Sequence, residues 1–162
     1  MNNQIKIWRA FLALAALLLT TLALQSQAQA QNPTPEEAIG YVKTVTGEAW
    51  VITAGQRVKA QAGSVVLLGS QLKTGAAATM GVTFRDDTVM SFGPDTELTV
   101  DEYLYAPARD QLRLSARLAK GTLNYLSGVI ARLKPDAVSV KTPAGIIGVR
   151  GTQFVARVED SK

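Results

Sequence analysis

From Gly40 onward, the chain consists of short apolar or alternating segments separated by glycine, proline or aspartate. The breaks recur about every 8–12 residues, which is typical of a β-sandwich or barrel. Little sequence is left for helix, although Ser127–Lys134 could form a helical turn or an irregular crossover. We expect strands at Tyr41–Val45, Ala49–Thr53, Val65–Leu67, Gln71–Lys73, Thr79–Phe84, Thr88–Phe92, Glu97–Tyr103, Gln111–Leu118, Gly121–Tyr125, Ala137–Lys141 and Gln153–Val158.

Two segments show the period of two most clearly. In the first, Met80, Val82 and Phe84 share one face, and a turn at Arg85-Asp86-Asp87-Thr88 returns Met90 and Phe92 beside them. In the second, apolar positions alternate with basic or polar ones from Leu112 to Leu118. This second pattern predicts a half-buried strand that carries Arg113 and Arg117 side by side on its outer face.

The stretch Lys141–Phe154 is rich in glycine and must contain a turn, because Pro143 fixes its own φ and keeps the preceding residue out of helical geometry. We expect Gly145, Gly148 and Gly151 to adopt positive φ or to let another backbone approach closely. We therefore predict a kinked pair of strands here, with Arg150 in a crowded position between two glycines.

The order of several motifs resembles the FecR domain, a periplasmic β-domain first known from an iron-citrate sensor-regulator. The closing motif comprises Thr142, Pro143, Gly145, Gly148, Gly151, Thr152 and Phe154. Further landmarks are Gly47-Glu48-Ala49, Ala62-Gly63, Gly69–Gly75, Phe84–Thr88, Gly93–Thr96 and Gly121-Thr122-Leu123. The family normally has Asp-Gly at the turn where this chain has Asp87, which we expect to tolerate the left-handed conformation at some cost in strain.

The resemblance implies an all-β sandwich of jelly-roll type with glycine-rich turns. In the founding member, the domain belongs to a membrane-spanning protein that receives a signal from an outer-membrane transporter and passes it to a cytoplasmic sigma factor. We recognise no anti-sigma segment and no internal membrane span, and therefore do not expect that particular role. Because many relatives continue with further strands, we expect an edge open to a partner strand near Gln153–Val158, which includes Val155.

The first thirty residues resemble a secretory signal peptide. Lys6 and Arg9 are followed by the apolar run Ala10–Leu24 and by the small-x-small sequence Ala28-Gln29-Ala30. We expect cleavage after Ala30 and a periplasmic location; an uncleaved anchor is the alternative, and Ser26-Gln27-Ala28 offers a second cleavage frame. The predicted organisation is a signal peptide at 1–30, a flexible lead at 31–39, a β domain at 40–158 and a tail at 159–162.

Charge adds little to the choice of partner. The 17 basic and 13 acidic residues give a net charge of +4, which falls to +2 without Lys6 and Arg9. Residues 31–108 carry five basic and nine acidic side chains, whereas residues 109–162 carry ten and four. The basic half could meet an anionic partner. Alternatively, these charges lie on the solvent faces of interleaved strands, which we favour, and we expect no nucleic-acid partner.

The residue types argue against an enzyme. The chain contains no histidine and no cysteine, which removes the usual nucleophilic systems and most zinc sites. Asp101 and Glu102 are neighbours on a predicted strand, so we expect them on opposite faces. Turn chemistry accounts for Asp86, Asp87 and Asp95 better than calcium does. We predict no cofactor and no metal.

The binding candidates are Arg150, Arg113, Arg117 and Val155. Arginine suits bidentate contact with a carboxylate or phosphate, but Arg150 could instead bond to its own domain, which we favour. Trp50 could line a sugar-binding cleft, but we expect it in the core or at its edge. The first hypothesis is a non-enzymatic module that binds another envelope protein. The second is a domain that binds a glycan or a small anion.

Overall fold

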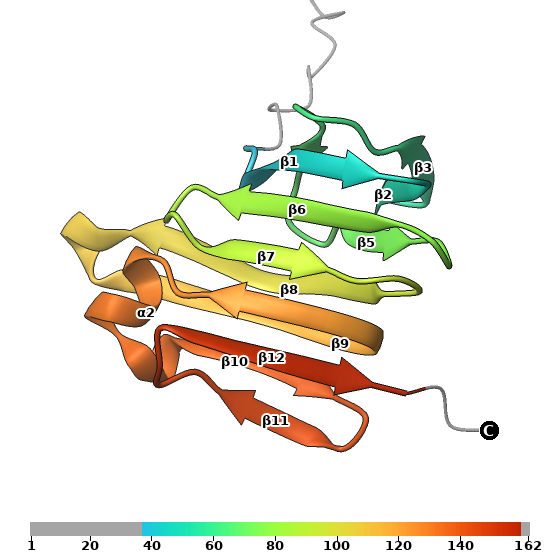
Figure 1. Cartoon of the computed structure of the whole chain (residues 1–162). Helices are drawn as coiled ribbons and strands as arrows, with labels where there is room; N and C mark the ends of the chain where they lie inside the picture. Colours follow the sequence, from blue (N-terminus) through green and yellow to red (C-terminus); the bar gives the residue numbers. More distant parts are fainter. Residues whose placement is uncertain (1–36, 160–162) are drawn as a thin grey trace, which may run out of the picture. The chain divides into compact units, whose positions relative to one another are not determined.

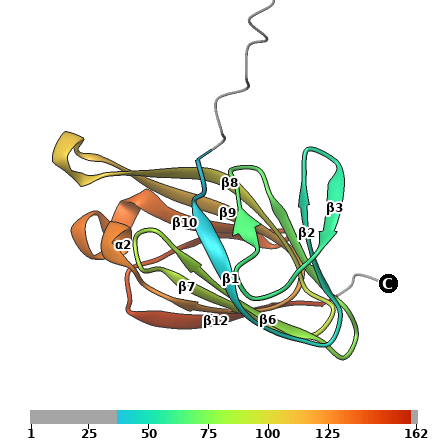
Figure 2. The ribbon, with the colours of Figure 1, turned by 90° about the horizontal axis from the view of Figure 1, so that it is seen from above.

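The structure, a computed structural model, describes residues 37–159 (Figure 1). The expected signal peptide lies outside these residues. The described part is all-β: its strands form one curled sheet, mostly antiparallel, whose two halves face each other across the core (Figures 1 and 2). Within residues 37–159, no helix is both long enough and apolar enough to cross a membrane.

Successive hydrogen-bonded strands form each half of the sheet, and both halves include part of β9 (Gln111–Leu126). The first half contains β1 (Gly40–Thr46), β4 (Val65–Val66), β6 (Thr79–Phe84), β7 (Val89–Phe92) and β12 (Gln153–Val158). The second half contains β2 (Ala49–Thr53), β3 (Gln56–Lys59), β5 (Gln71–Thr74), β8 (Glu97–Ala106), β10 (Val138–Thr142) and β11 (Gly145–Gly148).

The long strand β9 connects the two halves. Its first part pairs with β8 and, in parallel, with β10, whereas its last residues pair with β7 and β12. The prediction of two separate strands here was wrong. The strand continues through Gly121, which has a φ of +89°. Its backbone also passes so close to Thr96 that a Cβ would lie 2.4 Å from the Thr96 Cα, so glycine is required here.

The core lies between the two halves and follows the predicted period of two. Met80, Val82 and Phe84 of β6 are buried, as are Met90 and Phe92 of β7. This confirms the predicted hairpin, in which Met80 lies opposite Phe92 and Val82 opposite Met90. The alternate residues of β9 are buried too, which confirms the strand pattern there: Leu112, Leu114, Ala116 and Leu118.

Turn residues explain several of the aspartates. Asp87 adopts a φ of 64° in the β6–β7 turn, which confirms the left-handed conformation expected for this aspartate. Asp95 is also left-handed, with a φ of 49°. Asp86 is buried and accepts hydrogen bonds from the Thr88 hydroxyl group and from the backbone N–H of Ile130. It thereby holds the start of α2 (Val129–Leu133), the short helix in the segment for which the sequence left two alternatives.

The glycine-rich stretch folds into a hairpin. Its turn lies at Pro143 and Ala144, between β10 and β11, where Thr142 Oγ1 donates to the carbonyl oxygen of Gly145 over 2.9 Å. The predicted turn is therefore present, but β11 was not expected. Gly145 has the predicted positive φ, at 151°. The expectation for Gly148 and Gly151 was wrong, since neither has positive φ and a Cβ on either would meet nothing within 4 Å.

Candidate functional site

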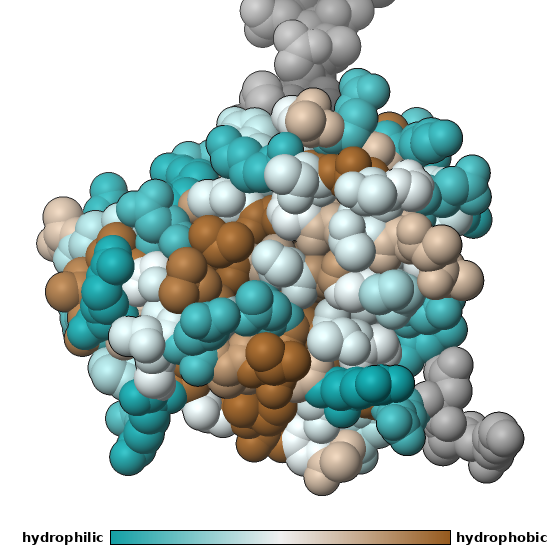
Figure 3. All heavy atoms as spheres, viewed as in Figure 1, coloured by the Kyte–Doolittle hydropathy of each residue, from teal (hydrophilic) through white to brown (hydrophobic). Residues whose placement is uncertain are grey.

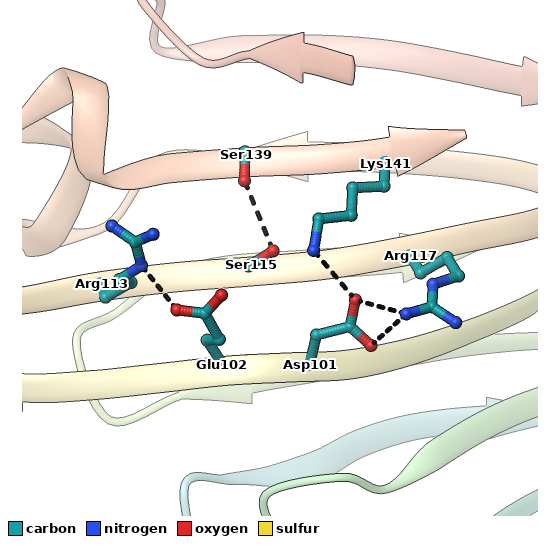
Figure 4. Close-up of polar contacts among 7 residues, drawn as sticks. All are labelled: Asp101, Glu102, Arg113, Ser115, Arg117, Ser139 and Lys141. Atoms are coloured by element: carbon teal, nitrogen blue, oxygen red, sulfur yellow. Dashed lines mark hydrogen bonds and ion pairs between the residues drawn. The ribbon is translucent and has the colours of Figure 1, made fainter. Parts of the chain in front are cut away.

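Two of the candidate arginines lie together on the outer face of the second half of the sheet. Arg113 and Arg117 project from β9, as predicted, and each meets a carboxylate of β8 (Figure 4). Arg113 Nε lies 2.5 Å from Glu102 Oε2, and Arg117 Nη2 lies 3.1 Å from Asp101 Oδ2. Lys141 of β10 also reaches Asp101, at 3.5 Å.

A β-bulge places both carboxylates on this face. The register of β8 against β9 shifts between Val100 and Glu102, so Asp101 has no direct partner on β9. Asp101 and Glu102 consequently point the same way (Figure 4), although they are consecutive. The expectation of opposite faces was wrong because a bulge breaks the strict alternation along a strand.

The pairing also shows how the two oppositely charged parts of the chain meet. Arg113 and Arg117 belong to the basic part, whereas Asp101 and Glu102 belong to the acidic part. The strands interleave, and the charges neutralise one another on one solvent face. This supports the second of the two interpretations of the charge distribution. An anion would have to displace Asp101 or Glu102 before it could contact these arginines.

Arg150 lies in the loop between β11 and β12, and its side chain is 81% exposed. The predicted crowding was wrong, since Gly148 and Gly151 have open space around them. Its guanidinium group donates to Asp136 Oδ1 over 3.0 Å, within the same domain. That contact was the favoured alternative. Because Asp136 is equally exposed, water screens the pair, and its contribution to stability is about 0–1 kcal/mol.

A groove of about 690 Å³ lies beside Arg150, between β12 and the β10–β11 hairpin. Its apolar lining includes Ala119, Ile147, Phe154, Ala156 and Val158. An apolar area is visible on the corresponding part of the surface in the space-filling view (Figure 3). Sequence reasoning singled out β12, Arg150 and the closing motif, which includes further lining residues, but it did not predict a groove. Finding the groove required knowing that β11 exists and that it lies near β12.

Two strand edges without a hydrogen-bonded neighbour border the groove. Among the described residues, β12 pairs only with β9, and β11 pairs only with β10. The N–H of Ser127 donates to the carbonyl oxygen of Thr152 over 2.8 Å, which fixes the alternation of the β9–β12 ladder. The backbone groups of Phe154 then face β9, whereas those of Gln153, Val155 and Arg157 face away from it.

Val155 occupies the middle of this edge and is 66% exposed. Ile146 of β11 is 71% exposed. Phe154, next to Val155, points the other way and stacks on the buried ring of Tyr125, with 5.1 Å between the ring centroids. The groove region therefore combines exposed apolar side chains with backbone groups that have no partner strand.

Trp50 does not belong to the core. It lies on the outer side of β2 between the buried Ala49 and Val51, and Arg57 of β3 stacks on its ring at 4.0 Å from the centroid. The prediction of a core or core-edge tryptophan was wrong. The indole is half-exposed, and the arginine covers one of its faces.

Within residues 37–159, no cluster of three or more carboxylates is arranged to hold a metal ion. The most deeply buried carboxylate, Asp86, already accepts bonds from Tyr103, Thr88 and Ile130. Burial and the charge of Asp86 hold the pKa of Tyr103 well above its usual range. Burial likewise raises the pKa of Tyr125. Both phenols stay protonated, and both belong to the core.

Comparison with known proteins assigns the chain to one family. No curated protein and no solved structure shows significant similarity to the chain. One family model does match, described as FecR protein, over residues 70–162. The match runs from the start of β5 through β12, includes the groove and the closing glycine-rich motif, and covers more than half of the sequence. The chain belongs to the FecR family.

Proposed function

We propose that this protein is an exported, non-enzymatic binding module of the bacterial cell envelope that engages another envelope protein through the edge of β12. The observation that carries the proposal is the groove between β11 and β12, where Val155 is exposed and the backbone groups beside it have no partner strand. Unpaired strand edges recruit further strands, and proteins use them for recognition.

The proposal includes a periplasmic location, a cleaved signal peptide and a jelly-roll arrangement of the strands. Membership of the FecR family supports a role in the cell envelope. The absence of histidine and cysteine from the sequence supports a binding role over catalysis. The paired charges on the outer face favour a partner at the groove over one at Arg113 and Arg117.

Site-specific photocrosslinking in living cells tests the proposal. A photoreactive residue at Val155 should capture one discrete envelope protein, identified by mass spectrometry. Val58 provides a matched control, since it is an exposed valine on β3, an edge strand in the second half of the sheet. Probes at Arg113 and Arg150 test two further candidate positions. Absence of a discrete protein adduct at Val155 would overturn the proposal, even if a probe at Arg113 captured a protein.

Trp50 favours one second candidate, a domain that binds a glycan. Its partly exposed indole lies on the outer face of β2, and an aromatic ring at such a position can stack on a sugar ring. Thermal stabilisation by cell-envelope glycans, lost on Trp50→Ala, would support this candidate. Stabilisation that persists in the Trp50→Ala variant would argue against Trp50 as the site.

A further inference from the structure

We propose that the groove between β11 and β12 accepts an extended strand of the partner, which pairs with β12, places apolar side chains in the groove at alternate positions and carries an acidic residue at the end beside Arg150. This inference rests on the proposed function and specifies the chemistry of the partner. It follows from three features of the groove: its backbone, its lining and its charge.

The backbone at the edge of β12 is suited to strand pairing. Gln153, Val155 and Arg157 direct their N–H and C=O groups away from β9. The register of β12 against β9 is continuous from Gln153 to Val158, without a bulge, and the segment contains no proline. Bulges and prolines usually protect an edge strand against pairing, and β12 has neither. A helix in the groove would leave these groups unpaired, whereas a strand would satisfy them.

The lining of the groove determines the pattern of that strand. Phe154 and Val158 of β12 and Ile147 of β11 point inward and pack against the core while remaining partly accessible. A strand beside β12 would direct every second side chain to the same side as Phe154. Those side chains must be apolar to fill the groove, whereas the intervening ones would face outward beside Val155.

The charges at the two ends of the groove differ. Arg150 lines the groove near the start of β12, whereas its carboxylate partner Asp136 is not among the residues that line it. Arg157 lies near the far end, where Glu159 lines the groove beside it with 3.7 Å between the charged atoms. The first end is therefore basic and the second is nearly neutral. An acidic residue is accordingly favoured at the Arg150 end alone.

Synthetic peptides provide the test. The probe is a peptide that alternates valine and threonine, with two aspartates at one end, and a second version carries them at the other end. We expect one version to bind the mature protein in isothermal titration calorimetry. In hydrogen exchange, we expect that version to slow the amides of Gln153, Val155 and Arg157. A scrambled peptide of the same composition should not bind.

Two edge variants form a matched pair. Val155→Pro removes an N–H that faces the free edge and leaves the ladder with β9 intact, so it should lower peptide affinity about tenfold or more. Lys59→Pro makes the same change at the edge of β3, where the N–H of Ala60 bonds to Ala49 and that of Lys59 faces away from β2. Lys59→Pro should leave the affinity unchanged.

A charge reversal tests the acidic end. Arg150→Glu should weaken the peptide that ends in aspartate about tenfold, and a peptide that ends in lysine should bind this variant better than it binds the original protein. Equal affinity of the aspartate and lysine peptides for both proteins would show that the partner strand needs no acidic residue beside Arg150. Slowed exchange elsewhere than in β12 would overturn the pairing.

The two proposals can fail separately. If Val155 captures an envelope protein in cells but neither alternating peptide binds, the strand inference is wrong and the binding module stands. If the peptides bind but no protein is captured at Val155, the groove accepts strands, and the proposed envelope partner is wrong.

Discussion

The hydroxyl group of Tyr103 donates a hydrogen bond to the buried carboxylate of Asp86, with 3.2 Å between the two oxygens. The N–H of Asp86 donates in turn to the Tyr103 oxygen over 3.0 Å. β8 is thereby bound to the β6–β7 turn. Tyr103→Phe should lower the free energy of unfolding by about 1–3 kcal/mol, because a buried charged acceptor loses a donor. Urea unfolding measures the change, and no loss would contradict the bond.

The same pair should limit stability in alkali. Burial, and then the charge of Asp86, raise the pKa of Tyr103 in the folded state, whereas the unfolded phenol titrates near pH 10. Above about pH 10, the unfolded chain loses a proton that the folded protein retains, so the contribution of Tyr103 to stability should be constant below that pH and fall above it. Tyr103→Phe should reduce this slope. Tyr125 should account for part of what remains, since its pKa is also raised.

Replacement by alanine should destabilise the protein strongly at one glycine and hardly at all at another. A Cβ on Gly128 would lie 2.3 Å from the Asp86 carbonyl oxygen and from the Thr88 nitrogen, both of which belong to the backbone. Gly128→Ala should therefore cost about 3 kcal/mol or more, since α2 would have to move. Gly148→Ala should change stability by less than about 0.5 kcal/mol, because the space there is open and φ is not positive. Thermal unfolding of both variants provides the comparison.

The exposed ion pairs should differ in how much they contribute to the stability of the fold. Asp101 is only 16% exposed and bonds to Arg117 and Lys141 on two neighbouring strands. Asp101→Ala should cost about 1 kcal/mol, because two cations lose a shared partner. Arg150→Ala removes a pair that is exposed on both sides and should cost close to nothing. Equal losses in chemical unfolding would show that burial of Asp101 has no influence.

Asp87 offers a route to higher stability. Its φ of 64° carries a steric cost for any residue with a Cβ, and its side chain is exposed. Asp87→Gly should raise the free energy of unfolding by about 0.5 kcal/mol. The removal of backbone strain stabilises the folded protein, and the greater conformational entropy of glycine in the unfolded chain offsets part of that gain. A lower melting temperature would mean that the carboxylate contributes more than the strain costs.

The sequence predicted the elements whose signal is local. The β6–β7 hairpin and the alternation from Leu112 to Leu118 were predicted correctly because each strand buries every second side chain. β3 was missed because all four of its residues are exposed, which leaves no alternation to detect. β11 was missed because its glycines resemble a loop.

The candidate site depended on relationships that no single segment carries. The bulge at Asp101 is a property of the pairing between β8 and β9. Because of this bulge, Asp101 lies on the same face as Glu102, whereas strict alternation along the strand would put the two on opposite faces. Val155 was identified from the strand pattern and the family resemblance, but the groove requires β11 and β12 to lie near each other. Trp50 was assigned to the core on its size alone, although its position on the strand places it outside.

The sharing of β9 between both halves of the sheet also suggests an order of folding. The β8–β9 hairpin is closed by a short 3-10 turn at Pro107–Arg109, so its contacts are near in sequence and should form early. Each half can then grow from one end of β9. Within residues 37–159, β12 is the last strand and pairs only with β9, so it should fray first and exchange its amides fastest. A strand bound beside it would close the most labile part of the domain.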